Sequence, residues 1–477
     1  MKLLKENYLL FILLALALIT RFLFLSYPAE VVFDEVYFGK FVSAYFTNEY
    51  YFDIHPPLGK LVIAGFSQVL GFPGSENSTR QAEKLPDQSA TGGRNQELGR
   101  ISTTRFEKIG EAANAYTLFI LRFLPALLGS LFVLIIYQLV IVLGGSKKAA
   151  FLAGFLIIFD NAFLVESKFI LVDSFLFFFG FLAILLFLIS RKQENIFKKY
   201  LFYFSSIICS GLAFSIKWTG LSFLGIILLF ILFDFLKKIS LKEFFELFVK
   251  TFFLIIIFLF VYILPFIFHF KFLTLSGPGD AFMSQDFQKT LIKENQEIKT
   301  MSFGSKFIEL NQKMYSYNVG LIKGHADSSK WNEWPFLKKP VWYWEKKDID
   351  KLANIYLMGN PLIWFSAGLA VFWGIYRLFK TKNEAYFLLL VGYFANLLPY
   401  ILVTRAAFLY HYLPALVFAI IILALWIGRS KKTFYFSYLI TVLLIFLIVS
   451  PISYGIFLPL NITSIYKLLV GIFHLSI

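Results

Sequence analysis

A series of apolar blocks, each about twenty residues long and separated by polar loops, constrains this chain more than any other feature. A block of that length crosses a bilayer as a helix, because a helix satisfies its own backbone hydrogen bonds within hydrocarbon. The alternating pattern of barrel strands is absent. We therefore expect an all-α polytopic membrane protein, with residues 1–477 forming a single transmembrane domain.

The blocks predict about eleven transmembrane helices. They lie near residues 8–26, 115–143, 149–166, 169–190, 199–216, 219–236, 248–269, 359–379, 385–403, 407–428 and 433–453. No small-x-small cleavage pattern closes the first block, so we expect an uncleaved helix there rather than a signal peptide.

The charges of the loops predict an orientation. Lys and Arg collect in alternate loops, and the positive-inside rule assigns that side, together with the N-terminus, to the cytoplasm. Two long segments, residues 27–114 and 270–358, then lie outside, and residues 74–110 form a polar excursion within the first of them. This alternation explains the formal charge of +15 better than a nucleic-acid partner does, because the basic residues form no single patch.

Two adjacent carboxylates, Asp34 and Glu35, follow the first apolar block. Most Asp-Glu pairs in proteins are solvated loop acids, but this one is flanked by apolar residues at a predicted membrane surface, where an ionised acid is costly unless it is paired or used. Burial and a neighbouring like charge both raise a carboxyl pKa and make the group a better general base for an alcohol. The pair is our first candidate for catalysis.

The segment DIHPPLGK, residues 53–60, follows within the same outer loop. Its two prolines predict a rigid turn. His55 is a candidate donor to a phosphate or a sugar hydroxyl, and Lys60 is a candidate to neutralise a phosphate.

Several charges lie within or near the predicted spans. Arg21 and Arg122 are near the outer ends of their helices, where they either snorkel to the interface or form a cationic seat for a lipid phosphate. The turn DNAFLVESKFILVDS holds Glu166, Lys168 and Asp173, which form either a buried structural ion pair or part of a binding site.

Three further outer segments carry candidate binding residues. Lys217 adds a cation at the turn KWTGL. The tryptophan-rich stretch of residues 324–347 contains His325, Trp331 and Trp334, which rest on the membrane as an interfacial belt or stack on a sugar ring. The turn TRAAFLYHY presents a plausible phosphate clamp, formed by Arg405, Tyr410 and His411.

Other classes of site receive little support. No GxGxxG or GxxxxGK[ST] motif is present, which argues against a nucleotide-sugar donor at the cytoplasmic face. The single cysteine, Cys209, excludes a disulfide or a cysteine metal site within one chain. A divalent metal held by carboxylates and a histidine is not excluded, although no ligand spacing argues for one.

The motifs FDEVYFGKF and FDIHPPLGK, followed by RFLPA, ESKFILVDS, GLAFSIKWTGL, SKWNEWPFLKKPVWYW and RAAFLYHYLPA, resemble the signature blocks of the protein O-mannosyltransferases, which use polyprenyl-phosphate mannose and belong to the GT-C superfamily. The blocks occur in the family's order and cover nearly the whole chain. Lys168 stands where the family usually has Arg. A lysine at this position cannot make the bidentate phosphate contact that an arginine can. The second outer segment has no room for the β-trefoil insert of eukaryotic members, so the resemblance implies a bacterial form.

The resemblance implies inverting transfer of mannose from a polyprenyl-phosphate-mannose donor to Ser or Thr hydroxyls of secreted or membrane polypeptides, with Asp34 as general base and Glu35 in support. It implies that the enzyme needs no cofactor, because the lipid-linked donor is a substrate. It also implies a location in the bacterial cytoplasmic (inner) membrane, with an extracytoplasmic active site. The expected partners are membrane lipids and the acceptor polypeptide, including one still in translocation, and a dimer stays open. Two alternatives remain: a GT-C transferase that modifies a lipid or a cell-wall glycan, and a polytopic transporter or flippase.

Overall fold

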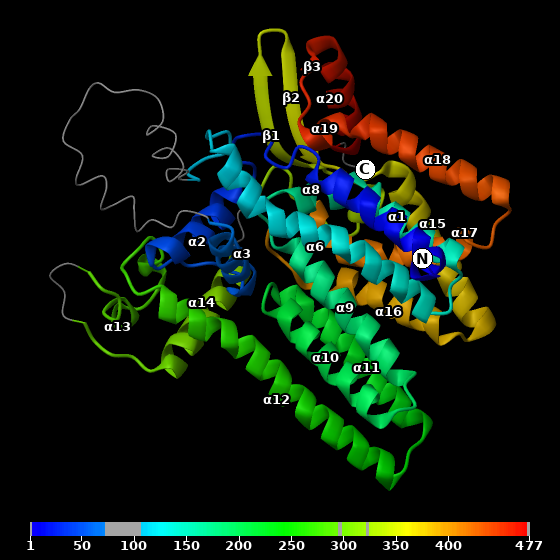
Figure 1. Cartoon of the computed structure of the whole chain (residues 1–477). Helices are drawn as coiled ribbons and strands as arrows, with labels where there is room; N and C mark the ends of the chain where they lie inside the picture. Colours follow the sequence, from blue (N-terminus) through cyan, green and yellow to red (C-terminus); the bar gives the residue numbers. More distant parts are fainter. Residues whose placement is uncertain (1, 72–105, 294–297, 321–323, 475–477) are drawn as a thin grey trace.

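The computed structural model describes residues 2–71, 106–293, 298–320 and 324–474. Most of the predicted excursion at 74–110 therefore lies outside the described residues. The long helices run in one general direction, and α2 (Glu35–Thr47), α3 (Leu58–Val69) and α14 (Phe303–Gly320) gather at one end of the bundle (Figure 1). The N-terminus lies toward the opposite end.

The remaining elements make up the bundle and its connections. The helices are α1 (Lys2–Phe22), α6 (Ala115–Val142), α7 (Lys147–Ile158), α8 (Asn161–Lys168), α9 (Asp173–Arg191), α10 (Ile196–Phe214), α11 (Leu221–Lys237), α12 (Leu241–Phe272), α13 (Gln285–Gln288), α15 (Pro361–Thr381), α16 (Glu384–Leu397), α17 (Leu413–Ile427), α18 (Lys432–Val449), α19 (Pro451–Tyr454) and α20 (Leu460–His474). The strands are β1 (Val341–Asp348), β2 (Lys351–Leu357) and β3 (Leu458–Pro459).

A helical membrane protein was expected, and the described residues form one. They include 8 helices that are long and apolar enough to cross a membrane, or up to 9 if the bent pair α7–α8 is one span. The prediction of about eleven spans exceeds this number. The blocks at 8–26 and 199–216 do form α1 and α10, but the apolar part of α1, Tyr8–Phe22, is short, and the lysines and serines of α10 lower its hydropathy.

The break between α7 and α8 shapes the region that holds the candidate site. The two helices meet at a bend of 60°. Asp160 caps α8 by accepting hydrogen bonds from the backbone N–H groups of its first turn. The Arg21 guanidinium donates to the carbonyls of Ile157 and Ile158 at the end of α7, at 3.0 and 3.4 Å. Both broken helix ends are thus satisfied by side chains, as a low-dielectric interior requires.

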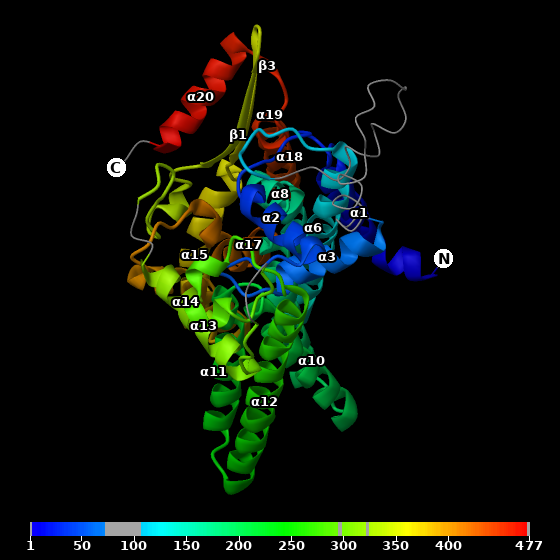
Figure 2. The same ribbon diagram turned by 90° about the vertical axis from the view of Figure 1, so that its left-hand side faces the viewer.

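A small antiparallel sheet was not foreseen from the sequence. Its strand order is β1-β2-β3, with a register irregularity between Trp342 and Trp344. The hairpin projects at the top of the view in Figure 2, and α20 packs beside it. Tyr343 and Trp344 of β1 are fully buried, so this hairpin belongs to the hydrophobic core and fixes the neighbouring residues 30–34.

Candidate active site

A cavity of about 410 Å³ opens at the end of the bundle that carries α2 and α14. Segments far apart in the sequence contribute to its wall: the turn before α3, the start of α9, the turn before α11, the end of α14 and the turn before α17. Seven of the predicted site residues line it, namely His55, Asp173, Lys217, His325, Arg405, Tyr410 and His411. The fold therefore brings together residues that the sequence places in five separate motifs.

Asp34 lies near this cavity, at the N-terminus of α2, although its side chain is not among those that line it. Its charge interacts with those of Asp173 and Lys217 in the cavity wall. The preceding Phe33 has a left-handed backbone, with φ of 46°, and its ring stacks on Tyr343 at 4.0 Å and meets Tyr410 edge-on at 6.4 Å. The backbone carbonyl of Asp34 accepts hydrogen bonds from Tyr37 and Phe38 in the first turn of α2. Its carboxylate accepts no hydrogen bond from any residue that the structure describes, so its acceptor capacity is free.

The surroundings of Asp34 favour its protonated form. Burial raises the pKa of this carboxyl from 3.8 to about 7. The negative charges of Asp173 and Asp53 raise the pKa further, whereas the ammonium group of Lys217 lowers it. A carboxyl with a pKa near neutrality is well matched to accept a proton from an alcohol at physiological pH.

Glu35 is in a very different environment, although it is the next residue. Its side chain is fully buried and forms a two-pronged ion pair with Arg122, with both N–O distances 2.7 Å. It also accepts from the backbone N–H groups of Val32 at 2.9 Å and Ile170 at 3.0 Å. Glu35 thus joins the entry to α2, α6 and the segment before α9, and it supports Asp34 by fixing the backbone.

The Arg122 guanidinium has no donor to spare. Besides Glu35 it binds the carbonyl oxygens of Leu25, Pro28 and Glu30, at 3.2, 3.0 and 3.0 Å, which uses all its N–H groups. The hypotheses that Arg122 snorkels or binds a lipid phosphate therefore do not fit the geometry. Arg21 is also buried and donates to carbonyl groups at the end of α7, although its Nε–H has no acceptor among the described residues.

Two predicted lysines also donate their hydrogen bonds to protein groups. Lys60 donates to Asp53 at 2.5 Å and to the carbonyls of His55 and Pro56 at 2.9 and 2.7 Å, which closes the His-Pro-Pro turn. Lys168 donates to the carbonyl of Leu23 at 2.7 Å, and its Nζ lies 4.1 Å from the centre of the Tyr454 ring. Neither lysine lines the cavity. No acidic partner of Lys168 is found within the described chain, so the expected ion pair around it does not form.

Asp173 and Lys217 form an ion pair in the cavity wall, with an N–O distance of 2.5 Å. Next to them, Glu166 accepts a hydrogen bond from the buried hydroxyl of Tyr343 at 2.8 Å. The proximity of Glu166 and burial together raise the pKa of Tyr343 well above its usual value, so the hydroxyl remains a donor. The sequence analysis did not identify Tyr343 or Asp53 as site residues. The only indication in the sequence was their position, Tyr343 in the tryptophan-rich stretch and Asp53 in the His-Pro-Pro segment.

The turn before α17 supplies the other polar wall. Arg405 is half-buried and forms no ion pair or side-chain hydrogen bond within the part of the chain that the structure describes. His411 accepts at Nδ1 from the Phe408 N–H at 3.1 Å and stacks on Tyr410 at 4.5 Å. Across the cavity, burial and nearby cations lower the pKa of His55 well below 6.5, so this imidazole is neutral at pH 7.

The tryptophan-rich stretch contributes mainly to packing. Trp334 is fully buried, donates to Ser329 at 3.0 Å and lies nearly parallel to His411, with ring centres 6.0 Å apart. Trp331 is partly buried against the core. Trp334 therefore has no free ring face for a sugar and does not rest on a membrane surface. His325, in contrast, lines the cavity and meets Phe408 edge-on at 5.2 Å.

The cavity thus combines a proton acceptor with cationic groups. Asp34 can accept a proton, Arg405 and Lys217 can stabilise an anion, and the neutral His55 can donate or accept a hydrogen bond. Among the described residues, no group of three or more His, Cys, Asp and Glu side chains is arranged to hold a metal ion.

Two family models match the chain. Residues 11–94 and 100–274 match the model described as dolichyl-phosphate-mannose-protein mannosyltransferase. Residues 303–469 match the C-terminal four-transmembrane region of protein O-mannosyltransferase.

Curated relatives agree with the models. The chain is 33% identical over 294 residues to dolichyl-phosphate-mannose–protein mannosyltransferase 4 of Candida albicans, covering 58% of this chain and 35% of that protein. It is 30% identical over 286 residues to protein O-mannosyltransferase 1 of Drosophila melanogaster, covering 58% of this chain and 29% of that one. The chain therefore spans only about a third of the length of such relatives.

Solved structures show a similar fold. The Saccharomyces cerevisiae protein O-mannosyltransferase Pmt1–Pmt2 complex bound to the sugar donor aligns with a TM-score of 0.79 at 21% identity, covering 94% of this chain and 90% of that one. The apo oligosaccharyltransferase of Archaeoglobus fulgidus aligns with a TM-score of 0.53 at 14% identity, covering 95% of this chain and 56% of that one.

Proposed function

The chain belongs to the dolichyl-phosphate-mannose-protein mannosyltransferase family, and from this membership we propose that it transfers mannose from a polyprenyl-phosphate carrier to Ser or Thr hydroxyls of polypeptides. The protein is a multi-pass membrane protein. One observation supports the proposed chemistry most directly. Asp34 has a free carboxylate with a pKa of about 7, and its charge interacts with those of Lys217 and Asp173. These two residues line a cavity together with Arg405, which is unpaired among the described residues.

The proposed reaction needs one base and an anion-binding wall. The Asp34 carboxylate accepts the proton of the acceptor hydroxyl while the hydroxyl oxygen attacks the anomeric carbon of mannose. The bond from that carbon to the phosphate oxygen breaks on the opposite side, so the configuration inverts, and the bond electrons leave with the polyprenyl phosphate. Arg405 and Lys217 stabilise the leaving phosphate, which needs no general acid.

The route for the lipid tail follows from adjoining cavities. A second space of about 350 Å³ shares Trp218, Thr219 and Tyr400 with the main cavity and continues between α11 and α16. An apolar groove of about 720 Å³ then continues it along α15 and α16, sharing Ala395 and Pro399. A phosphate in the main cavity would thus have its isoprenoid tail directed sideways into hydrocarbon.

The proposed orientation places the cavity outside the cytoplasm. Basic loops and the N-terminus lie toward the end of the bundle opposite α2 and α14 (Figure 1), and the positive-inside rule assigns that end to the cytoplasm. A bacterial-type enzyme in the cytoplasmic membrane, acting on polypeptides during or after their translocation, fits this arrangement. The geometry of the site does not require two copies of the chain to pair.

The test is a transfer assay in membranes. Wild-type membranes given polyprenyl-phosphate [¹⁴C]mannose and a Ser/Thr-rich peptide should label the peptide, and Asp34→Asn should lower the rate about 10²- to 10⁴-fold, because the hydroxyl then has no base. Asp286→Asn is the matched control, since this side chain is 83% exposed on α13 and should leave transfer unchanged.

Two outcomes would contradict the proposal. Label found only in glycolipid would favour the alternative transferase that acts on a lipid or glycan. Full activity of a well-folded Asp34→Asn protein would remove Asp34 from the role of base.

A further inference from the structure

The face formed by α15, α17 and α18 carries a groove of about 640 Å³ that is separate from the cavity at Asp34. Its walls are mainly apolar, with Leu362 and Leu369 from α15 and Trp426 from α17. Hydroxyl groups of Ser437 and Thr441 on α18 line the opposite wall, and Arg429 lies at its end, in the turn between α17 and α18.

Two guanidinium groups lie near the same indole ring, and one of them, that of Arg429, lines this groove. The guanidinium carbons of Arg377 and Arg429 are 5.7 and 5.9 Å from the centre of the same indole, that of Trp373. Trp426, which lines the groove, stacks on Trp373 with ring centres 5.5 Å apart and an angle of 9°. An anion bound beside either guanidinium group would offset its charge.

The described chain supplies no such anion. Neither Arg377 nor Arg429 has a carboxylate partner among the described residues, and the Arg377 Nε–H is buried without any acceptor. The sequences of α15, α17 and α18 contain no Asp or Glu. Lys431 and Lys432, exposed next to Arg429, add further positive charge.

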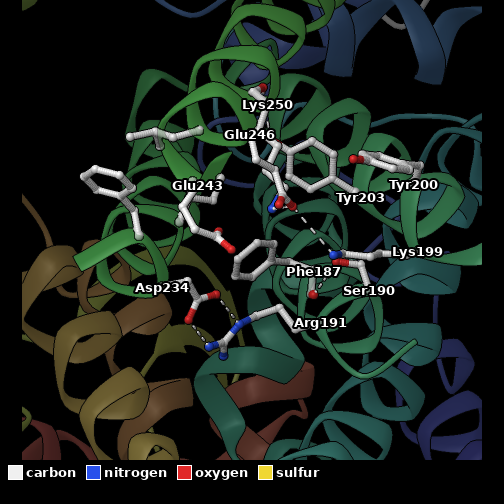
Figure 3. A pocket seen from close by; sticks show the side chains of 13 residues that line it. Phe187, Ser190, Arg191, Lys199, Tyr200, Tyr203, Asp234, Glu243, Glu246 and Lys250 are labelled. Atoms are coloured by element: carbon white, nitrogen blue, oxygen red, sulfur yellow. Dashed lines mark hydrogen bonds and ion pairs between the residues drawn. The ribbon is translucent and has the colours of Figure 1, made fainter. Parts of the chain in front are cut away.

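A second basic cluster at this end of the bundle makes the contrast clear. In the pocket between α9 and α12, Arg191 pairs with Asp234 at 2.5 Å (Figure 3). Arg191 also pairs with Glu384, which the figure does not draw, at 2.9 Å. Lys250 pairs there with Glu246 at 2.6 Å. That pocket is only about 50 Å³ in volume and holds its own acids. The chain thus neutralises one basic cluster internally and leaves the other open beside an apolar groove.

We propose that the groove between α15 and α18 binds one anionic phospholipid of the adjacent leaflet. Its phosphate lies at Arg429, and one acyl chain runs past Trp426 toward Leu362. A soluble anion would match the guanidinium groups alone, whereas an amphiphile matches both the charge and the apolar wall that opens to the bilayer. This site is independent of mannosyl transfer, and its ligand is a resident lipid rather than a substrate.

The experiment uses the full chain purified in a neutral detergent. Native mass spectrometry would count bound lipids during titration with phosphatidylglycerol or phosphatidylcholine of the same acyl chains. One molecule of phosphatidylglycerol should bind at least about fivefold more tightly than phosphatidylcholine, and Arg429→Gln should remove this preference, because a basic residue near the surface contributes about a fivefold preference for an anionic lipid. Lys238→Gln, an exposed cation on the α11–α12 turn, is the control and should keep the preference.

A second variant tests the groove itself. Ser437→Phe fills it and should weaken the binding of both lipids, whereas Ile440→Phe, at a position of α18 that is 57% exposed and outside the groove, should not. Raising the salt concentration should reduce phosphatidylglycerol binding to the wild-type protein, which tests the charge contribution without any substitution.

Three outcomes would overturn the proposal. The wild-type protein could bind the two lipids equally. Glycerol phosphate without acyl chains could compete as well as the phospholipid, which would indicate a soluble anion. A dimer that Ser437→Phe dissociates would show that a second copy of the chain occupies the groove.

Discussion

Asp34 and Glu35 are neighbours in the sequence but belong to two regions that use their charges in opposite ways. Glu35 belongs to a buried lock, which we define as Glu35, Arg122, Arg21, Lys60 and Lys168. The members of this lock bind protein groups, although the Nε–H of Arg21 has no acceptor among the described residues, and none of the members lines the cavity. Asp34 lies near the cavity and its charge interacts with those of Lys217 and Asp173 in the cavity wall. Its carboxylate and the Arg405 guanidinium keep free hydrogen-bonding capacity among the described residues.

The difference teaches how to interpret a charge near a membrane. Ionisable groups in spans are suspected of function by default, because burying them is costly. In this protein the lock serves the backbone instead: Arg122, Arg21 and Lys168 satisfy carbonyls where helices break or end. Function is better indicated by hydrogen-bonding capacity that the fold leaves unused, which only the geometry reveals.

The largest expected effect comes from breaking the lock. Glu35→Gln leaves the buried Arg122 charge without a counter-ion, and we expect a loss of about 3–5 kcal/mol in the free energy of unfolding. Thermal unfolding in detergent and the yield of folded protein from membranes would measure it. Activity should fall only in proportion to the loss of folded protein.

The double variant Glu35→Gln/Arg122→Gln is the matched control for this prediction. Removing both charges should cost less than the sum of the two single changes, because no uncompensated charge remains. Additive costs would show that Glu35 and Arg122 do not act as a pair. A stable Glu35→Gln protein with lost turnover would instead move Glu35 from the lock to the catalytic group.

The second-largest expected effect comes from replacing Arg405 in the cavity wall. Arg405→Gln removes the unpaired cation of its wall, and we expect kcat/KM to fall about 10²-fold while the unfolding temperature stays unchanged, because the developing phosphate charge loses one stabilising donor. Arg405→Lys should recover part of the loss, since it keeps the charge but not the fork of donors. An unchanged rate in Arg405→Gln, or a loss of stability without a kinetic effect, would place Arg405 in the lock.

Much of the fold could be predicted from the sequence, because apolar length directly determines a transmembrane helix. Every predicted span has a helical counterpart, including the bent pair at 149–166. The count was too high because α1 and α10 are shorter or more polar than a full crossing requires. The sheet was missed because Tyr343 and Trp344 look like interfacial aromatics in the sequence but are buried on the core side of β1.

The sequence predicted many of the residues that line the site, but it did not predict which charged residues have a structural role instead. Seven of the predicted residues line one cavity, since polar residues in outer turns must lie at the same end of a helical bundle. The sequence could not distinguish Arg405 from Arg122, because the difference lies in carbonyl groups that only the folded backbone presents. For the same reason it could not show that Lys60 closes its own turn.

The smallest expected effect is on the pH dependence, and it separates the two regions without disturbing the fold. Asp34 must be ionised to act as a base, so transfer should rise with pH through about 7 and fall about tenfold from pH 8 to pH 6. Lys217 lowers the pKa of Asp34, so Lys217→Gln should move the midpoint to higher pH, whereas Asp286→Asn should leave it in place.

Stability should change with pH in the opposite direction to activity. The pKa of Asp34 is higher in the folded chain, about 7, than its ordinary value of 3.8, so the folded state binds the proton more tightly over that interval. Ionising Asp34 therefore reduces stability as pH rises from about 4 through about 7. Asp34→Asn removes this slope and should be at least as stable as wild type at pH 8, while its transfer rate is about 10²- to 10⁴-fold lower. A flat activity profile between pH 6 and 8, or a variant less stable than wild type at pH 8, would assign Asp34 to the structural region with Glu35.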